Sequence, residues 1–282
     1  MINILVPVDF SQSSTTAVDF AVKSAKFLNA DVLLLHAFDV KNNLYTDYMG
    51  VNKEFNQTQL NEAKNKLIEL KDKIERTEEI VIDTIVDQNS LYRSIQEITE
   101  KQRIRLIVMG TAGESSLKKI LFGSNTAAII GKSKVPVMVV PQGYQWKKPE
   151  KILFATNHFE SEKHFLDLLF EMADLFMAQV NLGVFSDEEN TTALAFIDES
   201  NKLSSYENMI RRTYNEESIT ATYLLGDDFQ RSLDNYIDEN HIDILAMANY
   251  ERGFWENIFR TSMTRAMSYH TKIPLLAIPG KH

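Results

Sequence analysis

The residues with the clearest potential for chemistry form a glycine-containing stretch that suits the binding of phosphate groups. Gly110 and Gly113 are separated by two residues, and nine further residues lead to Gly123 and Ser124, where a helix is expected to begin. Glycine lets backbone N–H groups come close to a phosphate and permits positive φ. A helix N-terminus adds unpaired N–H groups and a partial positive charge. This spacing therefore predicts a site for a polyphosphate, with Ser124 as a helix N-cap or a phosphate donor.

A carboxylate follows the first apolar run of the chain. Residues 2–8 have the composition of a strand buried on both faces, and Asp9 comes directly after them. A carboxylate at a strand end can accept hydrogen bonds from a ribose hydroxyl or an adenine amine. His36 lies near the end of another buried run, 32–38. We expect it to be a satisfied structural histidine rather than a catalyst.

Strand and helix patterns alternate along the chain and predict the elements that position these residues. In the first half, strands are expected over 2–8, 32–38, 80–86, 106–109 and 136–140. Helices are expected after Ser11–Ser14, through Leu60–Ile74, over 92–101 and over 125–130, with a loop over 42–56. Five strands joined by crossover helices make a parallel, doubly wound α/β sheet. Ligands of such a sheet bind beyond the carboxyl ends of its strands.

The second half of the chain repeats the first. Residues 3–10 resemble 151–158 at an offset of 148, and 135–141 resemble 273–279 at an offset of 138. The second copy is therefore shorter, with the deletion in the connection after its second strand. The polar segment 142–149 contains a Gly and a Pro and is expected to be a linker. We predict two tandem domains, 1–143 and 149–282, each with a five-stranded parallel sheet.

With these motifs in place, the chain resembles a tandem universal stress protein, and the resemblance covers nearly the full length of both copies. It implies a Rossmann-like fold of the adenine-nucleotide-binding type, with ATP, alone or with Mg²⁺, as the ligand of the first copy. On that resemblance, adenine and ribose would be surrounded by Pro7, Val8, Asp9 and Ala37, and ribose and phosphates would be held by Met109, Gly110, Gly113, Gly123, Ser124 and Asn125.

The first copy departs from the family's pattern at Glu114, because a basic residue often follows the second glycine. We expect this carboxylate to weaken phosphate binding several-fold rather than abolish it. Glycines at a corner between strand, loop and helix can also serve only the turn, and this alternative stays open for the first copy.

The second copy keeps the spacing of the motif but loses its chemistry. Gly110, Gly113 and Gly123 are replaced by Ala248, Glu251 and Thr261, Asp9 is replaced by Asn157, and Ser124 is retained as Ser262. A Cβ at all three glycine positions crowds the path of the phosphates, and Glu251 adds repulsion. We therefore expect the second domain to be a degenerate copy that binds no ATP.

Composition and charge exclude several other classes of protein. The chain of 282 residues has no cysteine, which excludes disulfides, thiolate catalysis and iron–sulfur clusters. Its net charge of −9, without a basic block, argues against nucleic acid and against an anionic membrane surface as partners. No apolar run approaches the roughly 18 residues of a membrane span. The first residues lack the features of a signal peptide, so the cytoplasm is the expected location.

The resemblance implies nucleotide-dependent sensing or protection in a stress response, not metabolic turnover. No pair of nucleophile and general base stands out near the phosphates, so we expect slow ATP hydrolysis at most. One alternative is a nucleotide-free scaffold that acts through pairing surfaces. Another, with less support, is an adenine-nucleotide enzyme of related fold, although residues 7–11 match neither loop usual in such enzymes.

The last strand expected in each copy indicates how the two copies associate. Residues 136–140 and 274–278 are short, apolar and free of the charges that normally protect an exposed edge. We expect these strands to pair antiparallel about a pseudo-two-fold axis within the chain. Because single-domain relatives form homodimers of this kind, the chain resembles such a dimer with its halves linked. We also expect two chains to form a homodimer.

Overall fold

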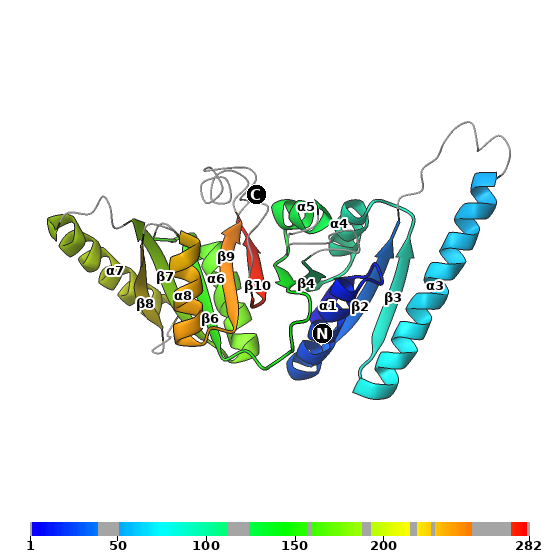
Figure 1. Cartoon of the computed structure of the whole chain (residues 1–282), viewed down its shortest axis with the longest axis horizontal. Helices are drawn as coiled ribbons and strands as arrows, with labels where there is room; N and C mark the ends of the chain where they lie inside the picture. Colours follow the sequence, from blue (N-terminus) through cyan, green and yellow to red (C-terminus); the bar gives the residue numbers. More distant parts are fainter. Residues whose placement is uncertain are drawn as a thin grey trace. The chain divides into compact units, whose positions relative to one another are not determined.

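The computed structural model describes residues 2–38, 51–111, 124–156, 159–187, 193–214, 219–226, 229–249 and 272–280. The chain divides into two compact units, Met1–Trp146 and Lys147–His282. We call these unit 1 and unit 2 and describe each by itself (Figure 1).

Unit 1 is a parallel α/β sheet built from alternating strands and helices. Its elements are β1 (Ile2–Pro7), α1 (Gln12–Leu28), β2 (Ala30–Ala37), α3 (Val51–Glu78), β3 (Ile82–Asp87), α4 (Leu91–Lys101), β4 (Ile104–Gly110), α5 (Ser124–Lys132) and β5 (Val137–Val140). The strand order is β3-β2-β1-β4-β5, and every neighbouring pair is parallel. The predicted doubly wound fold is therefore confirmed.

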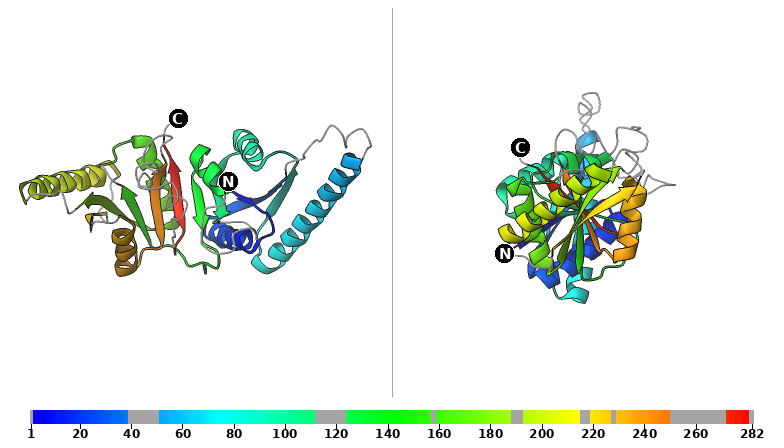
Figure 2. Two further views of the ribbon diagram at one scale, coloured as in Figure 1. Left: turned by 45° about the horizontal axis from the view of Figure 1, so that its top comes forward. Right: turned by 90° about the vertical axis from the view of Figure 1, so that its left-hand side faces the viewer.

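Helices cover both faces of the unit 1 sheet. Helix α1 packs on β1, β2, β4 and β5, whereas α4 and α5 pack against each other on the opposite face (Figure 2). Right-handed crossovers require helices on both faces. The chain crosses from β1 to β3 through α1 and α3, and it crosses in the opposite direction, from β3 to β5, through α4 and α5. The central strands are buried on both faces, and Ile4, Leu5 and Val6 of β1 are fully inaccessible to solvent.

Unit 2 repeats this architecture. Its elements are β6 (Lys151–Thr156), α6 (Lys163–Phe176), β7 (Gln179–Asp187), α7 (Ala193–Tyr214), β8 (Thr220–Gly226), α8 (Phe229–Asn240), β9 (Ile244–Asn249) and β10 (Leu275–Pro279). The order β8-β7-β6-β9-β10, again parallel, is that of unit 1. The shared topology bears out the internal repeat. Helix α7 has 22 residues against 28 for α3, which agrees with a shorter connection after the second strand.

The loop predicted over 42–56 is wrong in its last part. Helix α3 already begins at Val51, so residues 51–56 are helical. Residues 42–50 lie outside the described part of the chain. Residues 51–56 carry no clear apolar stripe, but they precede a long run of strong helix formers that extends the helix backwards.

The segment expected to be a linker is largely packed onto unit 1. Residues 142–146 run beside α1 and contact every fourth residue of it: Gln142 bonds Gln12 (2.8 Å), the Gly143 N–H bonds Thr16 (3.2 Å), the Tyr144 ring packs on Phe20, and the Trp146 indole N–H bonds Ser24 (3.1 Å). A spacing of four residues follows one face of a helix. The division between the units falls after this stretch, at Trp146.

Within the described residues, no helix has both the length and the apolar character needed to cross a membrane.

Candidate functional site

Three neighbouring strands of unit 1 end at the same edge of the sheet. Strand β1 pairs in parallel with β2 on one side and with β4 on the other. Their carboxyl ends bring together six of the predicted site residues, namely Pro7, Val8, Asp9, Ala37, Met109 and Gly110. Met109 and Pro7 are buried, so the main chain is what they can offer a ligand, whereas Asp9 reaches solvent.

The Asp9 side chain is held against the start of α1. Its Oδ1 accepts a hydrogen bond from the Ser11 N–H (3.0 Å) in a partly buried position. Partial burial alone would raise the pKa of the Asp9 carboxyl, but hydrogen bonds from Ser11 and Ser14 outweigh it and hold the pKa below the ordinary value. Asp9 is therefore a carboxylate at neutral pH. Because the residue is also exposed, the Asp9 carboxylate can accept a further bond from a ligand.

Helix α1 begins with a well-formed cap beside this carboxylate. Ser11 is the N-cap, and its hydroxyl oxygen accepts the Ser14 N–H at 3.1 Å. Serine is a favoured N-cap because its short side chain satisfies one of the free N–H groups of the first turn. The cap fixes where the chain leaves β1 and so fixes the position of Asp9.

The start of helix α5 is tied to the end of β4. The Thr126 hydroxyl donates a hydrogen bond to the Gly110 carbonyl oxygen (3.1 Å), although sixteen residues separate them. Ser124 and Asn125, which open the helix, are both exposed. The structure therefore brings the N-terminus of α5 to the edge at which β1 and β4 end. Gly113 and Gly123 lie in the connection between them, outside the described residues.

Gly110 has a packing role that does not depend on any ligand. A Cβ built on Gly110 would lie 2.6 Å from the Ser13 carbonyl oxygen and 2.7 Å from the Ser13 carbonyl carbon. Backbone atoms cannot move aside as a flexible side chain can. Part of the glycine motif is thus required by the contact between β4 and the first turn of α1.

Three aromatic rings gather where β1 and β2 end, and the sequence did not predict this cluster. The His36 ring lies 4.9 Å from the Phe10 ring and 5.9 Å from the Phe38 ring, centroid to centroid. Phe10 has a φ of 64°, in the left-handed region that bulky residues rarely adopt. A lone phenylalanine after a strand carries no signal for such a backbone, although the two strand ends on which the rings lie were predicted.

The His36 side chain is hydrogen-bonded, as expected of a structural histidine. Its Nδ1 lies 2.7 Å from the Val8 carbonyl oxygen. Since a carbonyl oxygen only accepts, Nδ1 carries the proton of this bond. The Val8 N–H donates in turn to the Leu35 carbonyl (2.8 Å). Both main-chain polar groups of Val8 are therefore bonded to residues of β2.

Among its described residues, unit 2 differs from unit 1 at the start of its first helix and at the end of its fourth strand. Helix α1 has 17 residues and α6 has 14, and both end on a left-handed cap at equivalent positions, Asn29 and Met177, so α6 lacks the first turn. The counterpart of Gly110 is Ala248, which is buried in β9. Ala248 thus carries a side chain at the position where Gly110 of unit 1 has none. Asn157, Glu251, Thr261 and Ser262 lie outside the described residues.

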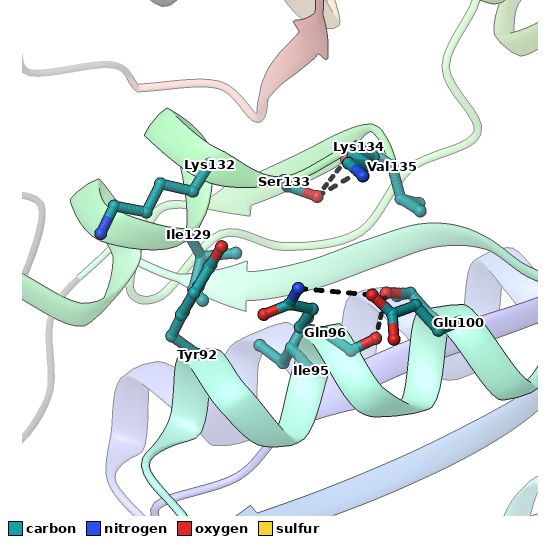
Figure 3. A pocket seen from close by; sticks show the side chains of 10 residues that line it. Tyr92, Ile95, Gln96, Glu100, Ile129, Lys132, Ser133, Lys134 and Val135 are labelled. Carbon is teal, nitrogen blue, oxygen red and sulfur yellow. Dashed lines mark hydrogen bonds between the residues drawn. The ribbon is translucent and has the colours of Figure 1, made fainter. Parts of the chain in front are cut away.

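A separate surface pocket of about 120 Å³ lies between α4 and α5 (Figure 3). Its lining includes Ile95 and Ile129, and the Gln96 amide of α4 donates a hydrogen bond to Glu100 of the same helix (3.3 Å). The Lys132 ammonium lies over the Tyr92 ring at 5.0 Å. None of the predicted site residues lines this pocket, so it is distinct from the edge at which the strands end.

Comparisons with known proteins agree on one family. The family model described as the Universal stress protein family matches residues 1–141. Universal stress protein MJ0577 of Methanocaldococcus jannaschii is 36% identical over 152 residues, which cover 49% of this chain and 93% of that protein. Universal stress protein MJ0531 of the same organism is 31% identical over 152 residues, covering 52% of this chain and 83% of its own length.

A solved structure extends the likeness to both units. A universal stress protein from Archaeoglobus fulgidus matches 98% of this chain and 98% of its own, with a TM-score of 0.67 and 17% sequence identity. At this identity the likeness concerns the fold. The sequence match to the family model, by contrast, coincides with the copy that keeps the glycine motif.

Proposed function

The chain belongs to the universal stress protein family, and we propose that unit 1 binds ATP at the carboxyl edge of its sheet, with Mg²⁺ as an accompanying ion. Binding would serve nucleotide-dependent sensing or protection in a stress response, in the cytoplasm. The observation that carries the proposal is the bond from Thr126 to the Gly110 carbonyl, because it supports a phosphate site at the N-terminus of α5, at the end of the strand that neighbours β1.

The end of β2 offers a match for the adenine edge. Along a strand, the main-chain N–H groups of successive residues point alternately to the two neighbouring strands. The Phe38 N–H points to β3, because it donates to the Asp87 carbonyl (3.1 Å). The N–H and C=O of Ala37 therefore face β1, on the side where the ligand would lie. Adenine presents an acceptor ring nitrogen next to a donor amino group, which fits this pair. The Asp9 carboxylate would accept a bond from a ribose hydroxyl, and Ser124 and Asn125 would bind the phosphates.

We propose a single nucleotide per chain. Unit 2 has Ala248 in place of Gly110, and its helix α6 begins about one turn later than α1, without the side-chain cap that Ser11 gives α1. Because no nucleophile and general base are paired among the proposed ligand-binding residues, we propose binding with at most slow hydrolysis.

Calorimetric titration with ATP tests both parts of the proposal. We expect a stoichiometry near one per chain, loss of binding in Gly123→Val, and unchanged binding in the matched control Thr261→Val. The new side chain in Gly123→Val would stand where phosphates approach the backbone. A stoichiometry near two would overturn the asymmetry between the units.

A nucleotide-free scaffold is the second candidate, and one observation favours it. The contact of Gly110 with Ser13 explains one glycine of the motif without a ligand. Absence of heat at millimolar ATP, together with absence of nucleotide in the denatured purified protein by mass spectrometry, would support the scaffold and contradict ATP binding.

We further propose that the two units pair antiparallel through their last strands and that two chains form a homodimer. Val139→Lys or Ala277→Lys would place a charge in these apolar strands and should split one unfolding transition into two. Unchanged cooperative unfolding in both variants would contradict the pairing. Sedimentation equilibrium of the wild-type chain would test the homodimer.

A further inference from the structure

The hydrogen-bond ladder between β1 and β2 ends in an unusual way. The regular pairs run from Ile2 and Ala30 to Pro7 and Leu35, and the Val8 N–H adds one more bond to Leu35. In a parallel ladder the next bond would run from the Ala37 N–H to the Val8 carbonyl. Among the main-chain bonds of the described residues that bond is missing, and the His36 Nδ1–H occupies the Val8 carbonyl at 2.7 Å. A side chain has replaced the last step of the ladder.

The His36 ring is held for this task by its neighbours. The Phe10 ring lies 4.9 Å from it and the Phe38 ring 5.9 Å, centroid to centroid. Phe10 reaches this position only with a φ of 64°, and the Lys66 ammonium of α3 lies 5.6 Å from its ring centre. A strained backbone persists where the surrounding structure enforces it, and such strain is concentrated at functional sites.

We propose that His36 is a positioning residue for base recognition: by occupying the Val8 carbonyl, it keeps the Ala37 N–H available to the ring nitrogen of a purine. This inference rests on the proposed function, since the base belongs to the same nucleotide. It goes beyond that function by assigning a specificity. A free N–H donor favours adenine, whose N1 accepts, over hypoxanthine, whose N1 carries a hydrogen. A site built to bond one partner discriminates strongly against its analogue.

Amide hydrogen exchange of the nucleotide-free protein tests the mechanism directly. In the wild type, the Ala37 amide should exchange as an open donor. His36→Phe retains a ring next to Phe10 and Phe38 but has no donor, so the Ala37 N–H should close onto Val8 and exchange at least about ten-fold more slowly. His36→Asn places an amide donor near the position of Nδ1 and should leave Ala37 open. Equal exchange in the wild type and His36→Phe would overturn the proposal.

Titration with ATP and with inosine triphosphate (ITP) tests the specificity. The wild type should prefer ATP, and His36→Phe should bind ATP about ten-fold more weakly, as expected for one lost hydrogen bond, with the preference largely gone. His36→Asn should retain most of the ATP affinity and of the preference for ATP. His164→Phe, at an exposed position, should change neither quantity. Matched melting temperatures would exclude a general loss of folding as the cause.

The outcomes separate this inference from the proposed function. If the wild type binds neither nucleotide, ATP binding and base recognition are both overturned. If the wild type binds ATP and His36→Phe keeps its ATP affinity and its ATP preference, only the role of His36 is overturned.

Discussion

Gly110 and Ser13 touch so closely that a single methyl group on Gly110 would meet the Ser13 backbone at 2.6 to 2.7 Å. This contact joins the end of β4 to the first turn of α1. In unit 2 the corresponding residue is Ala248, and helix α6 begins about one turn later than α1. The two differences agree with each other, because a Cβ at this position would meet the first turn of a helix placed like α1.

The first prediction concerns this contact. Gly110→Ala should lower the free energy of unfolding by about 1–3 kcal/mol, because the added Cβ meets backbone that must shift. Urea unfolding followed by circular dichroism measures the change. Gly131→Ala is the matched control, since a Cβ on Gly131 in α5 meets nothing within 4 Å. It should raise stability by about 0.5–1 kcal/mol through helix propensity. Equal effects of the two variants would contradict the packing role of Gly110.

The parallel doubly wound fold and the internal repeat were predictable from the sequence, because both rest on local patterns. Apolar runs such as 2–8 predict buried strands, and crossover connections allow few topologies for them. The glycine motif was also located correctly relative to β4 and α5. These features depend on residues that are close together in the sequence or recur at a fixed offset.

The features that the sequence did not predict depend on contacts between distant residues. The packing role of Gly110 requires Ser13 of another element, and no motif indicates it. The positive φ of Phe10 opposes the preference of the residue itself and follows from the rings around it. The bond from His36 to Val8 arises from the register of two strands, which the composition of neither strand determines.

The second prediction concerns Thr126, the residue that ties α5 to β4. Thr126→Val removes the hydroxyl that bonds Gly110 while retaining the branched shape of the side chain. The loss of one bond should cost about 1 kcal/mol of stability and, because the helix start is freed, weaken ATP binding several-fold. Chemical unfolding and calorimetry measure the two effects.

The control for Thr126 is Thr77→Val. The Thr77 hydroxyl bonds only main-chain carbonyls of its own helix, at Lys73 and Ile74. It should leave ATP affinity unchanged. If both variants affected ATP binding alike, the bond between Thr126 and Gly110 would have no special part in the site.

The third prediction concerns the pH dependence of stability at Asp9. Its pKa is lower in the folded protein than the ordinary value of 3.8, so its contribution is fully present above the unfolded value and is lost as pH falls through the folded value. Asp9→Asn should therefore be less stable than the wild type at pH 7, by less than about 1 kcal/mol because solvent screens a partly exposed group. The difference should shrink below about pH 4. A difference that stays constant down to pH 2 would show that the charge of Asp9 plays no part.

The fourth prediction concerns Asp243, which anchors the start of β6 in unit 2. Its side chain is only 6% exposed, and its Oδ2 accepts the N–H groups of Glu150 (2.8 Å) and Lys151 (3.0 Å). The other oxygen forms an ion pair with Lys147. Asp243→Ala leaves two N–H groups without their charged acceptor, so unfolding should become easier by about 2–4 kcal/mol.

A second acidic residue of unit 2 provides the control for Asp243. Asp238 pairs with Lys272 at 3.3 Å, but the two side chains are 62% and 77% exposed. An exposed pair contributes little because water screens it, so Asp238→Ala should change stability by less than about 0.5 kcal/mol. Urea unfolding of the full chain compares the two variants. If Asp243→Ala and Asp238→Ala had similarly small effects, the buried carboxylate would not be what holds the first residues of β6 in place.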